Sequence, residues 1–131
     1  MGRLKTALTD RVEAFADRGL ALAKKLEDEG VWSRVIDQMV GCFTSVGANV
    51  FEADEAMSRK DFCKSLAISV KELNESRYWI RRAISNTWVK ASRLAPLEAE
   101  AVELRRVLGA MVLHTSRTTG KNGQRVSPVR I

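Results

Sequence analysis

The chain has 131 residues, of which 45% are hydrophobic and 29% charged, and it contains only two prolines and eight glycines. This size fits a single domain, and a composition rich in helix formers is that of an ordinary soluble globular protein. The formal net charge of +6 favours a polyanionic partner.

Segments for export or membrane insertion are not expected. No apolar run approaches the roughly 20 residues that cross a bilayer, and charged residues from Asp10 to Arg18 interrupt any signal-peptide core. Cys42 and Cys63 show no CxxC spacing, so we expect both to be reduced core residues. These features predict a cytoplasmic protein.

The first half of the chain predicts two amphipathic helices. Apolar residues at spacings of three, four and seven predict a helix over residues 4–29, ended by Gly30. A second apolar stripe, which includes Trp32, predicts a helix over residues 31–53.

The second half of the chain predicts two more helices. Ser58 followed by Asp61 is typical of an N-cap, and the helix that it begins is expected to end near residues 85–87. Pro96 fits the first turn of a fourth helix, which is expected to fade after His114.

Four helices with short connections predict an all-α, antiparallel up-down four-helix bundle over residues 1–116. Residues 117–131 have no core pattern and predict a flexible basic tail. The bundle holds 18 Lys or Arg and 16 Asp or Glu, whereas the tail adds four basic residues and no acid. The tail therefore contributes most of the net charge.

Two surfaces are unusual for a monomer. On the second helix, four polar residues fall on one line beside two small residues: Gln38, Ser45, Asn49 and Glu52, beside Gly41 and Ala48. This pattern indicates either a solvated face or a helix–helix contact with internal hydrogen bonds. On the third, Ile68 and Trp79 lie away from the core stripe beside Glu72. An outward apolar strip predicts homo-oligomerisation, and we expect Arg77 to pair with Glu52 or Glu72.

The run over residues 38–73 resembles a bacterial four-helix-bundle family that includes proteins encoded in intervening sequences of large-subunit rRNA genes. The residues that carry the resemblance are Gln38, Ser45, Val46, Asn49, Glu52, the Ser58–Phe62 helix start, Ala67, Glu72 and Leu73. The continuation KELNESRYWIRRA resembles a subgroup pattern of that family. The chain has Glu52–Ala53 where the family has Glu–Gly, so the turn there is expected to differ.

The resemblance implies a ring, typically a homopentamer, with no catalytic site. The same family is similar to the accessory variability proteins of diversity-generating retroelements, which are basic pentamers that bind a reverse transcriptase and its template RNA. The resemblance thus implies three kinds of partner: further copies of this protein, RNA or DNA, and a reverse transcriptase.

The stretch RYWIRRAISNTWVKASR at residues 77–93 combines five basic residues with three aromatic ones. We expect its rings to pack and its cations to bind phosphates, although cations near a helix C-terminus are also favoured by the helix dipole. The predicted nucleic-acid-binding residues are Lys71, Arg82, Lys90, Arg93, Arg105, Arg106, Arg117, Lys121, Arg125 and Arg130.

Signatures of catalysis, metals and cofactors are missing from the sequence. His114 is the single histidine, no nucleotide-binding or hydrolase motif occurs, and we expect no metal, no cofactor and no small-molecule substrate. The leading hypothesis is a non-enzymatic, homo-oligomeric nucleic-acid-binding accessory protein. The alternatives are a structural or protein-interaction ring with no nucleic-acid role and, more remotely, a hydrolase using Glu52 and Glu72.

Overall fold

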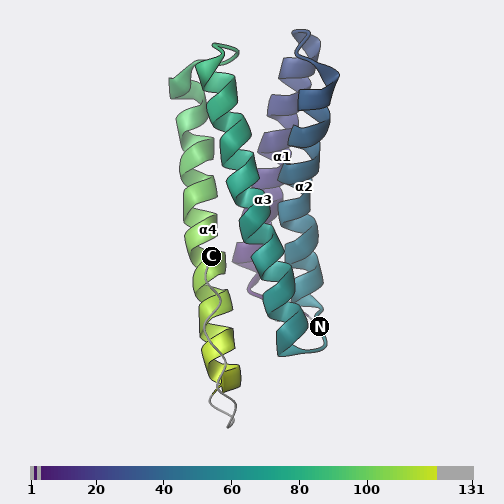
Figure 1. Ribbon diagram of the computed structural model, residues 1–131, viewed down its shortest axis with the longest axis vertical. Coiled ribbons are helices and arrows are strands. Elements are labelled where there is room, and N and C mark those ends of the chain that lie inside the picture. Colours follow the sequence, from purple (N-terminus) through teal and green to yellow (C-terminus); the bar gives the residue numbers. More distant parts are fainter. Residues whose placement is uncertain (1, 3, 121–131) are drawn as a thin grey trace.

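Four helices joined by short connections make up the part of the chain that the computed structural model describes, residues 2 and 4–120, with side chains up to Arg117. They are α1 (Thr6–Asp28), α2 (Ser33–Asp54), α3 (Arg59–Ser85) and α4 (Ala91–Gly120). These residues contain no strand, and successive helices run antiparallel (Figure 1). The predicted all-α bundle is confirmed.

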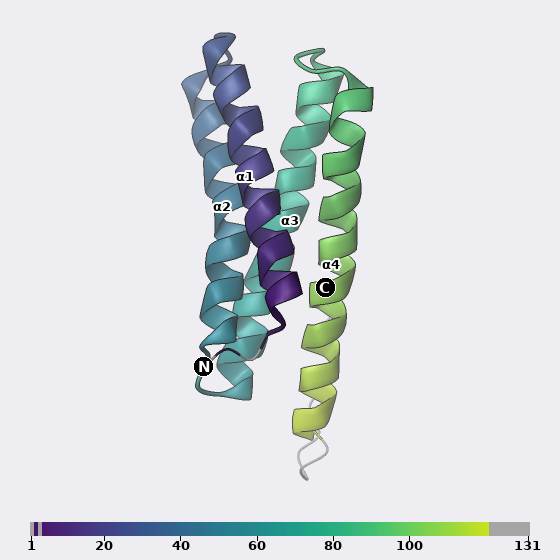
Figure 2. The ribbon, with the colours of Figure 1, turned by 180° about the vertical axis from the view of Figure 1, so that it is seen from behind.

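The helices form two hairpins, α1–α2 and α3–α4, that meet through α2 and α3 (Figure 1). The remaining edge is more open, because α1 contacts α4 at few positions. Figure 2 shows α1 nearing α4 toward its own N-terminus. There Arg11 donates hydrogen bonds of 2.7 and 3.1 Å to both carboxylate oxygens of Glu100. This bidentate pair ties the two outer helices together.

The core follows the apolar stripes of the four helices. Phe15 of α1 and Phe43 of α2 are fully buried, with ring centroids 5.4 Å apart. Gly19 lies directly against the Phe43 side chain, where a Cβ atom would overlap it. Between α2 and α3, the buried Ser69 hydroxyl donates a 2.8 Å hydrogen bond to the Val46 carbonyl, so this buried polar group is satisfied.

The helix ends agree with the predicted capping signals. The Asp61 N–H donates a 3.1 Å hydrogen bond to the Ser58 hydroxyl, which confirms the predicted N-cap of α3. Gly30, at φ 85°, closes α1: its N–H reaches the Glu27 carbonyl, and the next N–H reaches that of Leu26. This is a Schellman motif, and it places glycine where a left-handed backbone is required.

Thr87 occupies the equivalent position after α3. Its φ is 57°, its N–H donates to the Ile84 carbonyl, and the Trp88 N–H donates to that of Ala83. A threonine in the left-handed region is strained, because its Cβ crowds the following carbonyl.

Two sequence predictions about α4 are wrong. The helix begins at Ala91 and not at Pro96, because the Arg93 N–H bonds to the Lys90 carbonyl and closes a turn before the proline. Pro96 therefore lies inside the helix and withholds one backbone donor. The helix also continues past His114 to Gly120, so the first four residues of the predicted tail are helical. The other tail residues, 121–131, lie outside the described residues.

Other expectations are corrected by burial. Trp32 was expected in the core, yet it is 73% exposed and precedes the first turn of α2. Both cysteines are free, as predicted, but only Cys42 is fully buried. Burial raises the pKa of its thiol to about 11. Within the described residues, none of the helices combines the length and apolar character that a membrane crossing demands.

We predict that Thr87→Gly stabilises the fold by about 1 kcal/mol, since glycine adopts a positive φ without strain. Thr87 is exposed, so its loss removes no core packing. Thermal unfolding followed by circular dichroism measures the effect. Gly30→Ala is the matched control and should destabilise the fold, because nothing but backbone strain opposes a Cβ there. An unchanged or lower melting temperature for Thr87→Gly would refute the strain.

Candidate nucleic-acid interface and self-association surface

Charge is divided unequally between the two hairpins. Residues 1–58, which include α1 and α2, hold seven Lys or Arg and ten Asp or Glu; we call them the acidic half. Residues 59–120, which include α3 and α4, hold twelve basic and six acidic residues; we call them the basic half. The basic face is therefore built into the bundle, whereas the sequence analysis assigned most of the charge to the tail.

Two acids of the basic half are already engaged by arginines. Glu100 accepts both hydrogen bonds from Arg11, which belongs to the acidic half. Glu103 accepts bonds of 2.6 and 3.1 Å from Arg106. These bonds lower the pKa of Glu103 and raise that of Arg106. Arg106, one of the predicted phosphate ligands, is thus held by an acid.

Three of the predicted cations gather where α3 passes into α4. The Arg82 carbonyl accepts the backbone N–H of Asn86, the C-cap of α3, and the exposed Lys90 and Arg93 lie in the first turn leading into α4. One end of the basic half therefore carries three cations close together in the sequence, which we call the cationic group.

The other predicted cations are spread along the helices. Lys71 is exposed in the middle of α3, Arg105 is half-buried in the middle of α4, and Arg117 is exposed near its end. Fourteen residues of helix, about 21 Å, separate Arg105 from the start of α4. Lys121, Arg125 and Arg130 lie outside the described residues.

An open groove that the sequence did not predict lies at the end of α3, with Arg82 among its lining residues. It has a volume of about 490 Å³ and we call it the tyrosine groove; its lining residues are Tyr78, Arg81, Arg82, Ile84, Ser85 and Glu98. The rings of residues 77–93 were expected to pack, which holds for the half-buried Trp79 and Trp88. It is wrong for Tyr78, which is 55% exposed. A helical wheel that puts Tyr78 opposite Ile80 and Leu73 could have found it.

The polar line of α2 is not buried within the chain. Gln38, Gly41, Ala48 and Glu52 are exposed, and an added Cβ at Gly41 would meet no atom within 4 Å. Asn49 donates to the Ser45 carbonyl at 2.9 Å and to its hydroxyl at 3.1 Å. The hydrogen bonds shown for this line are thus internal to α2, and its small residues leave room for another helix to approach.

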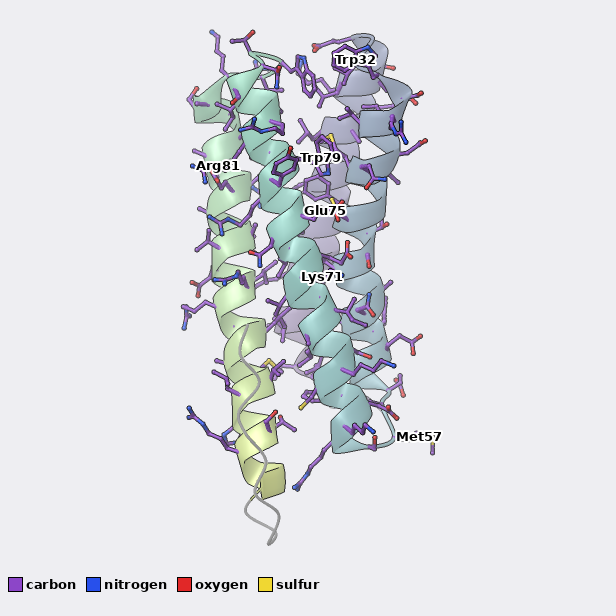
Figure 3. The ribbon with its side chains drawn as sticks, in the orientation of Figure 1. Trp32, Met57, Lys71, Glu75, Trp79 and Arg81 are labelled. Atoms are coloured by element: carbon purple, nitrogen blue, oxygen red, sulfur yellow. The ribbon has the colours of Figure 1, made fainter. Side chains whose placement is uncertain are left out.

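A second open groove lies between the beginning of α2 and the flank of α3. It has a volume of about 570 Å³ and we call it the tryptophan groove; its lining residues are Trp32, Ser33, Arg34, Val35, Gln38 and Trp79. Trp79 was expected to point outward, but it packs partly against the core and its Nε1–H donates to Glu75 at 3.4 Å. Ile68 of the same strip is 36% exposed. Figure 3 places Trp32 and Trp79 at the same end of the bundle.

The predicted ion pair of Arg77 with Glu52 or Glu72 is wrong. Arg77 forms no ion pair with a described residue, and its buried Nε has no hydrogen-bond partner in the chain. Glu72 lies on the flank of α3 toward the tryptophan groove, where burial and then the charge of Glu75 raise its pKa above the ordinary 4.5. The two glutamates lie on different helices, Glu52 exposed and Glu72 half-buried.

The described side chains include no cluster of three His, Cys, Asp or Glu residues able to hold a metal ion. What the described surface offers is a basic face with one exposed aromatic ring, and a separate flank with small and apolar residues. Such an arrangement suits binding of a polyanion and of other helices.

Comparison with protein families shows the family to which the chain belongs. The model of the 23S rRNA-intervening sequence protein family matches residues 7–110. The chain belongs to this family. The match confirms the resemblance inferred from residues 38–73, and it covers all of α2 and α3.

A solved structure supports the same placement in the family. A crystal structure from Bacteroides thetaiotaomicron, described as a protein of unknown function from the S23 ribosomal protein family, is 30% identical. The alignment covers 80% of this chain and 97% of that one, with a TM-score of 0.77. Among curated proteins, none matches the sequence significantly. Neither the family model nor this structure names an enzyme.

We predict that Glu72→Gln raises stability at neutral pH. The pKa of Glu72 is higher in the folded chain than the ordinary 4.5 of the unfolded chain. Between these two pKa values the folded state binds more protons than the unfolded state, so the free energy of unfolding falls as the pH rises through this range. Glutamine removes this loss. Urea unfolding at pH 4 and pH 7 measures it, with the exposed Glu52→Gln as control. Equal pH dependence in wild type and Glu72→Gln would contradict the prediction.

Proposed function

We propose that this protein is a non-enzymatic, homo-oligomeric nucleic-acid-binding accessory protein. The observation that carries the proposal is the separation of charge between the two hairpins, which gives the basic half twice as many basic as acidic residues. A one-sided basic surface is the usual electrostatic footprint of a nucleic-acid-binding domain.

Arginines that form no ion pair support phosphate binding by this half. Arg77, Arg82 and Arg105 form no ion pair with a described acid. Their Nε atoms are buried, so contact with a phosphate falls to their terminal NH2 groups. Phosphate oxygens are acceptors that match arginine donors in charge and geometry. Each phosphate so neutralised steepens the salt dependence of binding by about 0.7 to 0.9 on a log–log scale.

Self-association would multiply this modest surface. The outer face of α2 offers the small residues Gly41 and Ala48, and the tryptophan groove and Ile68 offer apolar area beside it. Exposed apolar area next to small residues suits packing against a further helix. A ring of copies, a homopentamer by resemblance, would gather several basic halves on one particle, and weak contacts become firm when many engage together.

In its most specific form, the proposal places the protein beside a reverse transcriptase and its template RNA. This rests on the resemblance of the chain to accessory variability proteins of diversity-generating retroelements. A reverse-transcriptase gene and a repeated template next to the gene for this protein would support it.

A structural or protein-interaction ring with no nucleic-acid role is the second candidate. The name of the matching family favours it, because it ties the family to intervening sequences within rRNA genes and states no binding activity. Affinity capture that recovers proteins but no nuclease-sensitive material would favour this candidate.

Binding of labelled single-stranded RNA, followed by fluorescence anisotropy at rising salt, tests the proposal. We predict that the double variant Lys71→Glu/Lys90→Glu weakens binding about tenfold or more, since it reverses two exposed cations of the basic half. The control, Lys5→Glu/Arg18→Glu, makes the same charge change on exposed residues of the acidic half. It should change affinity less than about twofold. No binding at low salt, or equal losses in both variants, would refute the proposal.

Light scattering tests the self-association. We predict an oligomer for the wild type and a shift toward the 14.6 kDa monomer for Ala48→Arg, because a long cation would fill the space beside α2. Ala14→Arg, on the exposed face of α1, should leave the mass unchanged. A wild-type monomer at working concentration would refute this part.

A further inference from the structure

The tyrosine groove combines features that the other described surfaces do not share. It lies where the last turns of α3 meet the first turns of α4, and Arg82 of the cationic group is one of its lining residues. It is an open hollow with two arginines and one glutamate on its walls. Its charge and its access from solvent suit a flexible anionic chain.

The Tyr78 ring is held in a fixed orientation by its neighbours. The guanidinium carbon of Arg82 lies 5.4 Å from the ring centroid, in cation–π contact. Trp79 meets the ring edge-on, with centroids 5.2 Å apart. The tyrosine is nevertheless 55% exposed. The guanidinium group lies over one face of the ring, so the exposed part of the tyrosine ring is the platform for stacking.

We propose that the tyrosine groove binds an unpaired nucleotide of a single-stranded nucleic acid. This inference rests on the proposed function and names the form of nucleic acid that the basic half prefers. The base stacks on the exposed side of the Tyr78 ring, which Arg82 braces from the other side, and the adjoining phosphate is bound by Arg81. Stacking on aromatic rings and on arginine planes is how proteins hold unpaired bases.

Arg81 is free to exchange its partner. Its Nε lies 3.8 Å from Glu98 Oε2, beyond ordinary hydrogen-bond length, and its side chain is 66% exposed. A phosphate can replace this loose contact with a direct charge-assisted bond. Figure 3 shows Arg81 toward α4, on the opposite flank of α3 from Trp79.

A single strand is favoured over a duplex by the chemistry of the platform. Bases inside a duplex are already stacked on each other and present no free face to Tyr78. Phosphates alone would need only cations, which the basic half supplies elsewhere. An acidic peptide would satisfy Arg81 but would gain nothing from an exposed aromatic platform.

The test compares a fluorescein-labelled single-stranded RNA of mixed sequence with its duplex. We expect Tyr78→Ala to weaken single-strand binding roughly tenfold, the loss typical of one stacked base. Tyr78→Phe, which keeps the ring, should stay within about twofold, and Arg81→Gln should weaken binding. Glu98→Gln should strengthen it, because it removes the acid that competes for Arg81. Duplex binding should respond little to Tyr78→Ala.

Phe51→Ala is the matched control, since Phe51 is a 57% exposed aromatic on the acidic half and should leave affinity unchanged. Circular dichroism checks that each variant folds, and the ring-preserving and Glu98 variants test the groove even if Tyr78→Ala unfolds. Equal affinity of Tyr78→Ala and wild type for the single strand would overturn the inference. So would equal competition by polyglutamate and by single-stranded RNA.

The outcomes separate this inference from the proposed function. If reversal of Lys71 and Lys90 weakens binding while Tyr78→Ala does not, the basic half binds nucleic acid by phosphate contacts and the groove inference fails alone. If neither strand form binds at low salt, both fail.

Discussion

The antiparallel pairing of α3 with α4 places two helices with an excess of cations side by side, with α1 and α2 beyond them. Like charges on adjacent helices repel each other, and burial of their apolar stripes offsets that cost. Leu66, Leu73, Leu104 and Leu108 are fully buried at this contact and in the core beside it. Each fully buried leucine contributes about 1.5 to 3 kcal/mol. The core therefore outweighs the modest repulsion between the two helices.

Because α3 packs on both α2 and α4, its two flanks serve different purposes. The flank toward α2 carries Trp79 and borders the tryptophan groove, and the flank toward α4 carries Arg81 and borders the tyrosine groove. The proposed function assigns self-association to the first flank and nucleic-acid binding to the second. A single long helix thus links assembly to binding in the proposed function.

The number of helices, most of their bounds and the core followed from the sequence, because apolar spacing and caps such as Ser58 are local signals. The exceptions have physical reasons. Pro96 was placed in a first turn, yet backbone hydrogen bonding begins the helix earlier. Trp32 has an apolar body but a polar edge, so periodicity alone could not fix its exposure. The exposure of Tyr78 could have been predicted from its place on the helical wheel, opposite Ile80. The separation of charge becomes visible only once the two hairpins are counted apart.

Acetylation of lysines with and without single-stranded RNA, read by mass spectrometry, tests the central claim directly. Both halves carry exposed lysines, which makes each the control for the other. The account predicts that RNA protects Lys64, Lys71 and Lys90 of the basic half and leaves Lys5 and Lys24 of the acidic half unchanged. Protection of Lys5 and Lys24 instead, or equal protection of both halves, would contradict it.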